Sequence, residues 1–126
     1  MTATDERPPV YGDVHNPADV EVKIEETKNR IAAGVKVVTE AERKAKAART
    51  EFDYQFALAI GRATGPAVNH RYQATVDTIE YRKVAEGLEI TFRHAQRTAE
   101  ALERELFAWQ SILNSVRAMY GAAGAR

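Results

Sequence analysis

Three histidines, His15, His70 and His94, are the side chains of this sequence best suited to hold a metal ion or transfer protons. A metal site on one helix needs two ligands three or four residues apart on the same face. No two of these histidines have that spacing, and none follows a glutamate by three residues, as di-metal sites in helical bundles require. We therefore predict surface histidines, with no metal and no cofactor.

Glutamates form clusters at residues 25–26 and between residues 100 and 105. Lysines and arginines lie three or four positions from them, a spacing typical of ion pairs on a solvated helix face. The sequence has no glycine-rich phosphate loop, nucleophile elbow or Ser-His-Asp arrangement. We therefore expect a protein that is not an enzyme and has no small-molecule substrate.

The remaining chemistry is attraction of phosphate groups by basic side chains. Lys plus Arg and Asp plus Glu each number 18, so any preference must come from charge position rather than from net charge. Residues 1–27 hold seven acidic and two basic side chains, and residues 28–49 hold seven basic and two acidic ones. A basic stripe near the middle of the chain could bind nucleic acid or another partner, and a solvated helix face is the alternative. The candidate residues are Arg43, Lys44, Lys46, Arg49, Arg62 and Arg71.

These residues would be positioned by two long helices. Asn16 and Pro17 form a helix start, and small or apolar residues then recur in alternating steps of four and three, which predicts a coiled-coil helix over residues 17–63. Gly65 and Pro66 predict a turn at residues 64–66. The same steps resume over a second predicted helix, residues 67–120. We call these recurring positions the seam, because the two helices would pack against each other along them. The seam positions are Val20, Ile24, Thr27, Ile31, Gly34, Val38, Ala41, Ala45, Ala48, Phe52, Gln55, Ala59, Ala74, Thr78, Tyr81, Ala85, Leu88, Phe92, Ala95, Ala99, Leu102, Leu106, Trp109, Leu113, Val116 and Tyr120.

The predicted fold is therefore all-α: a long antiparallel two-helix hairpin over residues 16–120, flanked by a flexible N-terminal arm (1–15) and a frayed tail (121–126). A turn near Gly65 pairs residues whose numbers sum to roughly 130, so that small groups on one helix face larger ones on the other. We expect Gly34, which costs about 1 kcal/mol against alanine in mid-helix, to make room for a bulky neighbour.

Apolar residues outside the seam predict self-association. The stretch from residue 102 to residue 120 is apolar on several sides, and a helix of that kind is normally covered all round. We expect a homo-oligomer, most simply a dimer that forms a four-helix assembly. The candidate self-association residues are Phe107, Ile112, Val116, Met119 and Tyr120.

Composition sets the remaining expectations. The chain has no cysteine, so it has no disulfide framework, and no uncharged apolar run approaches the roughly 20 residues needed to cross a bilayer. The N-terminus also lacks the apolar segment of a signal peptide. We expect a cytoplasmic protein that does not bind membranes.

Three segments of residues 40–124 resemble the small helical-hairpin coil proteins that tailed bacteriophages, often of actinobacterial hosts, encode among their replication and recombination genes. They are AERKAKAARTEFDY (41–54), RATG (62–65) and LFAWQSILNSVRAMYG (106–121). The resemblance implies a viral protein in the host cytoplasm with a non-enzymatic accessory role, such as assisting recombination or single-strand-binding proteins on DNA. It brings no functional residue pattern with it.

The sequence leaves three hypotheses for the function, each from a different class of protein. The first is an oligomeric interaction module, accessory to phage DNA replication or recombination through the basic half near the turn. The alternative is a structural coiled-coil adaptor or scaffold that binds only protein. A third is a secreted helical hairpin of the actinobacterial type VII kind, but the Trp-x-Gly motif expected at the turn is absent, and Trp109 lies far from it.

Overall fold

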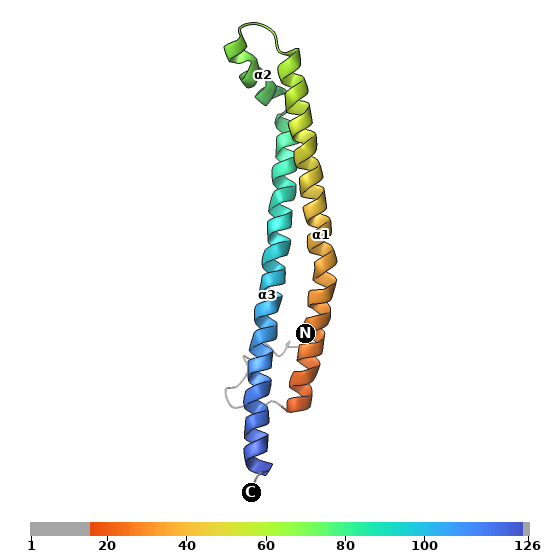
Figure 1. Cartoon of the computed structure of the whole chain (residues 1–126), viewed down its shortest axis with the longest axis vertical. Helices are drawn as coiled ribbons and strands as arrows, with labels where there is room; N and C mark the ends of the chain where they lie inside the picture. Colours follow the sequence, from red (N-terminus) through yellow and green to blue (C-terminus); the bar gives the residue numbers. More distant parts are fainter. Residues whose placement is uncertain (1–15, 125–126) are drawn as a thin grey trace, which may run out of the picture. The chain divides into compact units, whose positions relative to one another are not determined.

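The computed structural model describes residues 16–124, and every element in that range is a helix. Helix α1 spans Pro17–Arg62, the short 3-10 helix η1 spans Ala67–Asn69, α2 spans His70–Asp77 and α3 spans Ile79–Gly124 (Figure 1). The predicted all-α class is confirmed. The predicted arm, residues 1–15, lies outside the described residues.

Helix α1 begins as its sequence predicts. The side-chain oxygen of Asn16 accepts a hydrogen bond from the Ala18 N–H at 2.9 Å, and the Asn16 carbonyl accepts one from the Val20 N–H at 3.1 Å. The first bond satisfies a donor that a helix start leaves without an intrahelical partner, and the second is the first regular bond of the helix. The helix ends at Arg62, one residue before the predicted end, and Gly65 then takes a positive φ of 84° that residues other than glycine rarely adopt.

The second predicted helix is interrupted. It opens with the 3-10 turn of η1 and breaks again at Thr78, where φ is −112° and ψ is 11°. Both the hydroxyl and the N–H of Thr78 donate to the Ala74 carbonyl, at 2.6 and 3.0 Å. The same hydroxyl bond occurs at Thr27, Thr91 and Thr98 within unbroken helices, so it accompanies the break at Thr78 without explaining it.

At the other end, α3 continues through Gly124, so the predicted stop at Gly121 is wrong. Alanines follow Gly121 at the next two positions, and alanine has the strongest helix propensity of all residues. Residues 125–126 lie outside the described part of the chain.

The chain divides into two compact units, each with segments of α1 and α3. We call residues 16–29 with 103–124 the terminal unit, and residues 30–102 the turn unit. Each is described by itself below.

Large side chains form the core of the terminal unit. Val20, Ile24 and Leu113 are buried together. The half-buried side chains that pack against them are Leu106, Trp109 and Ile112. The start of α1 therefore packs against the end of α3 in an antiparallel arrangement. Thr27 is also buried, and its hydroxyl donates to the Lys23 carbonyl at 2.8 Å, so burial leaves it hydrogen-bonded.

Alanines form the core of the turn unit, where α1 and α3 lie side by side (Figure 1). The buried side chains are Ala45, Ala59, Ala74, Thr78 and Ala85. Ala45 and Ala85 line one groove and Ala48 and Tyr81 line another, which agrees with the antiparallel register predicted from the turn. Along α1 every predicted seam position is buried or half-buried, and beyond the turn only Tyr81 and Tyr120 are exposed.

Gly34 does not face a bulky neighbour, contrary to the prediction. A Cβ atom added there would meet nothing within 4 Å, and the same is true at Gly87. The seam opposite Gly34 is itself built from small residues such as Ala95 and Ala99, so the two helices leave a hollow rather than an interlocked contact.

Candidate functional site

The predicted basic residues of α1 are mostly paired with carboxylates on the same helix. Arg43 donates to Glu40, Lys46 lies 3.7 Å from Glu42, and Arg49 lies 3.5 Å from Asp53. The guanidinium of Arg49 also lies 5.4 Å from the ring centre of Phe52, within cation-π range. Local carboxylates therefore balance three of the six predicted cations.

The Arg43–Glu40 pair also shifts the pKa values of both side chains. The hydrogen bond from Arg43 holds the pKa of Glu40 below its ordinary value, and the positive charges of Arg43 and Lys44 act in the same direction. The reciprocal hydrogen bond raises the pKa of Arg43. Both side chains stay ionised at neutral pH. The negative charge of Glu40 therefore offsets the positive charge of Arg43.

These cations also do not share one face. At 3.6 residues per turn, Arg43, Lys44, Lys46 and Arg49 are distributed over roughly 220° of the circumference of α1. The structure thus brings no single basic stripe together from this segment.

Two other predicted cations lie where carboxylates are missing. Arg62 ends α1 and Arg71 is the second residue of α2, and among the described residues neither has a carboxylate partner. The sequence contains no Asp or Glu between Asp53 and Asp77. We call residues 54–76 the turn region; its formal charges are those of its two arginines, with His70 neutral.

The turn region is held in one conformation by hydrogen bonds from α2. The side-chain amide of Gln73 accepts from the Thr64 N–H at 3.2 Å and donates to the Thr64 carbonyl at 2.6 Å. The Nε2 atom of His70 lies 2.9 Å from the Gly65 carbonyl, so this ring nitrogen carries the hydrogen. The bend is therefore fixed by three side-chain contacts to backbone groups.

The outer face of η1 and α2 is apolar and exposed. Val68, Tyr72 and Val76 follow one another at intervals of four residues and are 75%, 72% and 71% exposed. The inner face carries Ala74 and Thr78, which are buried. We call Val68, Tyr72 and Val76 the apolar stripe. Its large side chains point outward while small ones point inward, the reverse of an ordinary surface helix.

Sequence reasoning missed the apolar stripe as a unit. None of its three residues is among the predicted site residues. The spacing of these three residues by four is a helical signal that was readable in the sequence. It was obscured because the same segment also continues the buried seam at Ala74 and Thr78.

The predicted self-association residues divide into two groups. Val116 is buried within the terminal unit and Ile112 packs against its core, so both contribute to intrachain packing. Phe107, Met119 and Tyr120 are 71%, 56% and 52% exposed. Phe107 and Met119 are about 120° apart around α3, so these exposed residues do not form one face.

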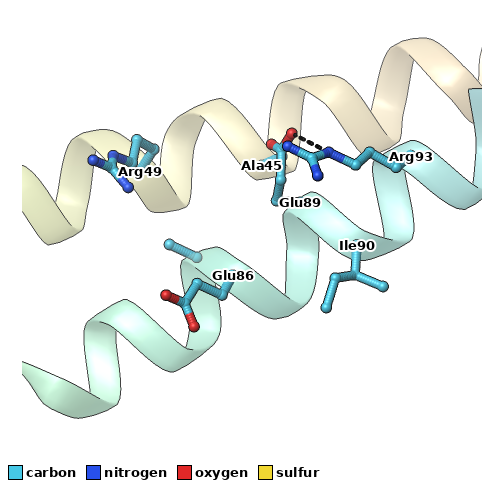
Figure 2. Close-up of a pocket in the computed structure, with 7 residues that line it drawn as sticks. Ala45, Arg49, Glu86, Glu89, Ile90 and Arg93 are labelled. Carbon is cyan, nitrogen blue, oxygen red and sulfur yellow. Dashed lines mark hydrogen bonds and ion pairs between the residues drawn. The ribbon is translucent and has the colours of Figure 1, made fainter.

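A charged groove of about 450 Å³ lies between α1 and α3 in the turn unit. Ala45 and Ala85 are buried in its lining, and Figure 2 shows Ala45 on α1 across from Glu86 and Glu89 on α3. Arg93 donates to Glu89 at 3.2 Å and Arg82 donates to Glu86 at 2.9 Å, so the acidic side chains of the groove have partners on their own helix. The groove contains no nucleophile and no histidine, and we assign it no chemistry.

A second groove, of about 510 Å³, is almost entirely apolar. Its lining includes Gly34, Val37, Ala41, Ala95 and Ala99. The hydroxyls of Thr91 and Thr98, which also line it, donate to backbone carbonyls one turn earlier, at 3.2 and 3.0 Å. It arises where small residues face each other across the helix pair.

Within the described residues, no group of three histidine, aspartate or glutamate side chains is arranged to hold a metal ion. None of the described helices combines the length and the apolar character needed to cross a membrane. Comparison of the chain with family models, with curated proteins and with solved structures found no match.

Proposed function

We propose that the protein is a non-enzymatic interaction module that binds a macromolecular partner through the turn region. The observation that carries this proposal is the apolar stripe. Contiguous exposed apolar side chains on a monomer mark interaction sites, because leaving them in water is unfavourable. Burying a valine or tyrosine side chain stabilises a complex by about 1.5–3 kcal/mol before the costs of association.

A protein partner is favoured, which corresponds to an adaptor or scaffold. Aromatic residues and arginine are enriched where binding energy concentrates, and Tyr72, in the middle of the apolar stripe, directly follows Arg71 in the sequence. Side chains at intervals of four residues lie on one face of a helix, so a single partner can cover all three residues of the stripe.

Self-association is part of the proposal. The exposed Phe107, Met119 and Tyr120 of the terminal unit favour a dimer, with the four-helix assembly as its simplest form. Because these side chains lie on different faces of α3, Phe107 contacts a different surface from Met119 and Tyr120.

The test is capture of partners with a photo-crosslinking amino acid placed at Leu58, an exposed residue of the turn region, in otherwise wild-type protein and in Val68→Ser/Val76→Ser protein. Crosslinked partners that disappear in the double variant would support the turn region as the binding site. Equal yields from both proteins would overturn it. Val22→Ser/Val35→Ser is the matched control, since those valines are exposed to a similar degree on α1.

A second candidate is the accessory role in phage DNA metabolism, in the host cytoplasm, that the resemblance to phage hairpin proteins implies. Arg62 and Arg71 lack carboxylate partners among the described residues, and Tyr72 offers a ring for base stacking. Two phosphate contacts on single-stranded DNA give a log–log salt slope of about −1.4, whereas all six predicted cations would give about −4.2. Titration of labelled single-stranded DNA between about 50 and 200 mM salt therefore distinguishes the two sites.

A further inference from the structure

We propose that the partner of the turn region is a short acidic polypeptide segment that carries large apolar side chains. This inference rests on the interaction function proposed above and specifies the chemistry of the ligand. It follows from the charges of the turn region, from the size and shape of the apolar stripe, and from the rigidity of the bend.

The charges favour an acidic ligand. Elsewhere in the turn unit, arginines such as Arg43, Arg49 and Arg93 are matched by carboxylates three or four residues away. Arg62 and Arg71 have no such match among the described residues, and no acidic residue occurs between positions 53 and 77. A guanidinium binds a carboxylate through two parallel hydrogen bonds, so both arginines are available to carboxylates from outside the chain.

The apolar stripe favours a short segment. Val68, Tyr72 and Val76 cover one side of about two helical turns, which is far less than the roughly 800 Å² per partner of a standard interface between folded proteins. A linear segment of several residues suffices to cover it. Large apolar side chains on that segment would replace the water around the two valines and the tyrosine.

The same residues argue against nucleic acid as the ligand. Binding of single strands relies on successive aromatic platforms and on a groove with many cations. Here two aliphatic side chains flank Tyr72 along the stripe, and two arginines neutralise few phosphates. Valine provides no ring for stacking but does provide apolar area for leucine or phenylalanine.

The bend is ordered before any ligand arrives. Gln73 bonds both backbone groups of Thr64, and His70 bonds the Gly65 carbonyl, which connects α2 to the chain that follows α1. A surface that is already ordered avoids the entropy cost of organising itself on binding. A short ligand with few contacts needs that advantage.

The experiment measures binding of fluorescein-labelled peptides to the full chain by fluorescence anisotropy. The probe is the peptide Asp-Leu-Asp-Asp-Phe-Leu-Asp-Glu. One comparison peptide replaces its leucines and phenylalanine with serine, a second replaces its acidic residues with lysine, and a labelled single-stranded oligonucleotide of eight thymidines is the third probe. Circular dichroism checks that each protein variant keeps its helix content.

We expect the acidic apolar peptide to bind at least about tenfold more tightly than either comparison peptide, because it alone supplies both charge pairs and apolar burial. Arg71→Gln and Tyr72→Ser should each weaken it by about tenfold, since each removes one of these contributions. The matched controls Arg97→Gln and Val35→Ser, at exposed positions outside the turn region, should leave binding unchanged.

Failure of the acidic apolar peptide to bind more tightly than the serine and lysine peptides would overturn the inference. Oligonucleotide binding that Arg71→Gln abolishes, without peptide binding, would also overturn it while keeping the turn region as a binding site. Loss of partner crosslinking in the Val68→Ser/Val76→Ser protein, without binding of any of these probes, would likewise reject this ligand class and leave the proposed function standing.

Discussion

The terminal unit and the turn unit contain segments of the same two helices, but they differ in the size of the residues between them. Valine, isoleucine, leucine and tryptophan fill the seam of the terminal unit, and an ion pair of 2.7 Å between Arg117 and Glu21 joins its two helices. In the turn unit the buried seam residues are alanines and a threonine, and the ion pairs Arg43–Glu40, Lys83–Glu80 and Arg93–Glu89 each join residues on one helix.

This difference shows that one heptad pattern can produce either a core of large side chains or a seam of small ones that leaves grooves. In the terminal unit Val20, Ile24 and Leu113 bury most of their apolar area within the chain. Alanines let helices approach but bury little area, so grooves remain between α1 and α3 in the turn unit.

The comparison is tested most strongly by Leu113→Ala in the terminal unit. We expect a loss of about 3 kcal/mol in the free energy of unfolding, since a nearly buried leucine leaves a cavity. Ala85→Gly, at an equally buried seam position of the turn unit, should cost about 1 kcal/mol. Urea unfolding followed by circular dichroism measures both, and Trp109, the single tryptophan, reports on the terminal unit. Similar losses in both variants would contradict the contrast.

A smaller effect of opposite sign is expected from Gly34→Ala. An added Cβ meets nothing within 4 Å, so the substitution should raise the free energy of unfolding by up to about 1 kcal/mol. Gly87→Ala, which has the same open surroundings, is the matched variant and should give a similar gain. Destabilisation by Gly34→Ala alone would mean that the hollow beside it is closed in solution.

The smallest expected effect concerns the local ion pairs of the turn unit. The depressed pKa of Glu40 means that its contribution to folded stability is complete above the unfolded-state pKa and is lost as pH falls through the lower folded-state pKa. An NMR titration of the Glu40 carboxyl should show this depression in the wild type and its relief in Arg43→Gln. Leu113→Ala should leave the titration unchanged below the unfolding transition, because the pair lies within one helix.

Much of the fold was readable from local patterns. The heptad steps identified nearly all seam positions, and the cap residues Asn16 and Pro17 located the start of α1, because both signals act within one or two helical turns. The break at Thr78 was not predicted, since threonine also fits a seam. The candidate site was predicted in part: Arg62 and Arg71 were identified, whereas Val68 was not.

The sequence by itself determined the helical class, the seam and the position of the turn, because helix periodicity, capping and glycine conformation depend on near neighbours. Only the tertiary structure decided which apolar residues are already used within the chain. Val116 is buried and Met119 is exposed although both lie in one apolar stretch, since coverage depends on the facing segment of α1. It likewise decided that Val68, Tyr72 and Val76 are exposed while Ala74 and Thr78 are buried, because burial depends on which face of this segment meets the rest of the turn unit.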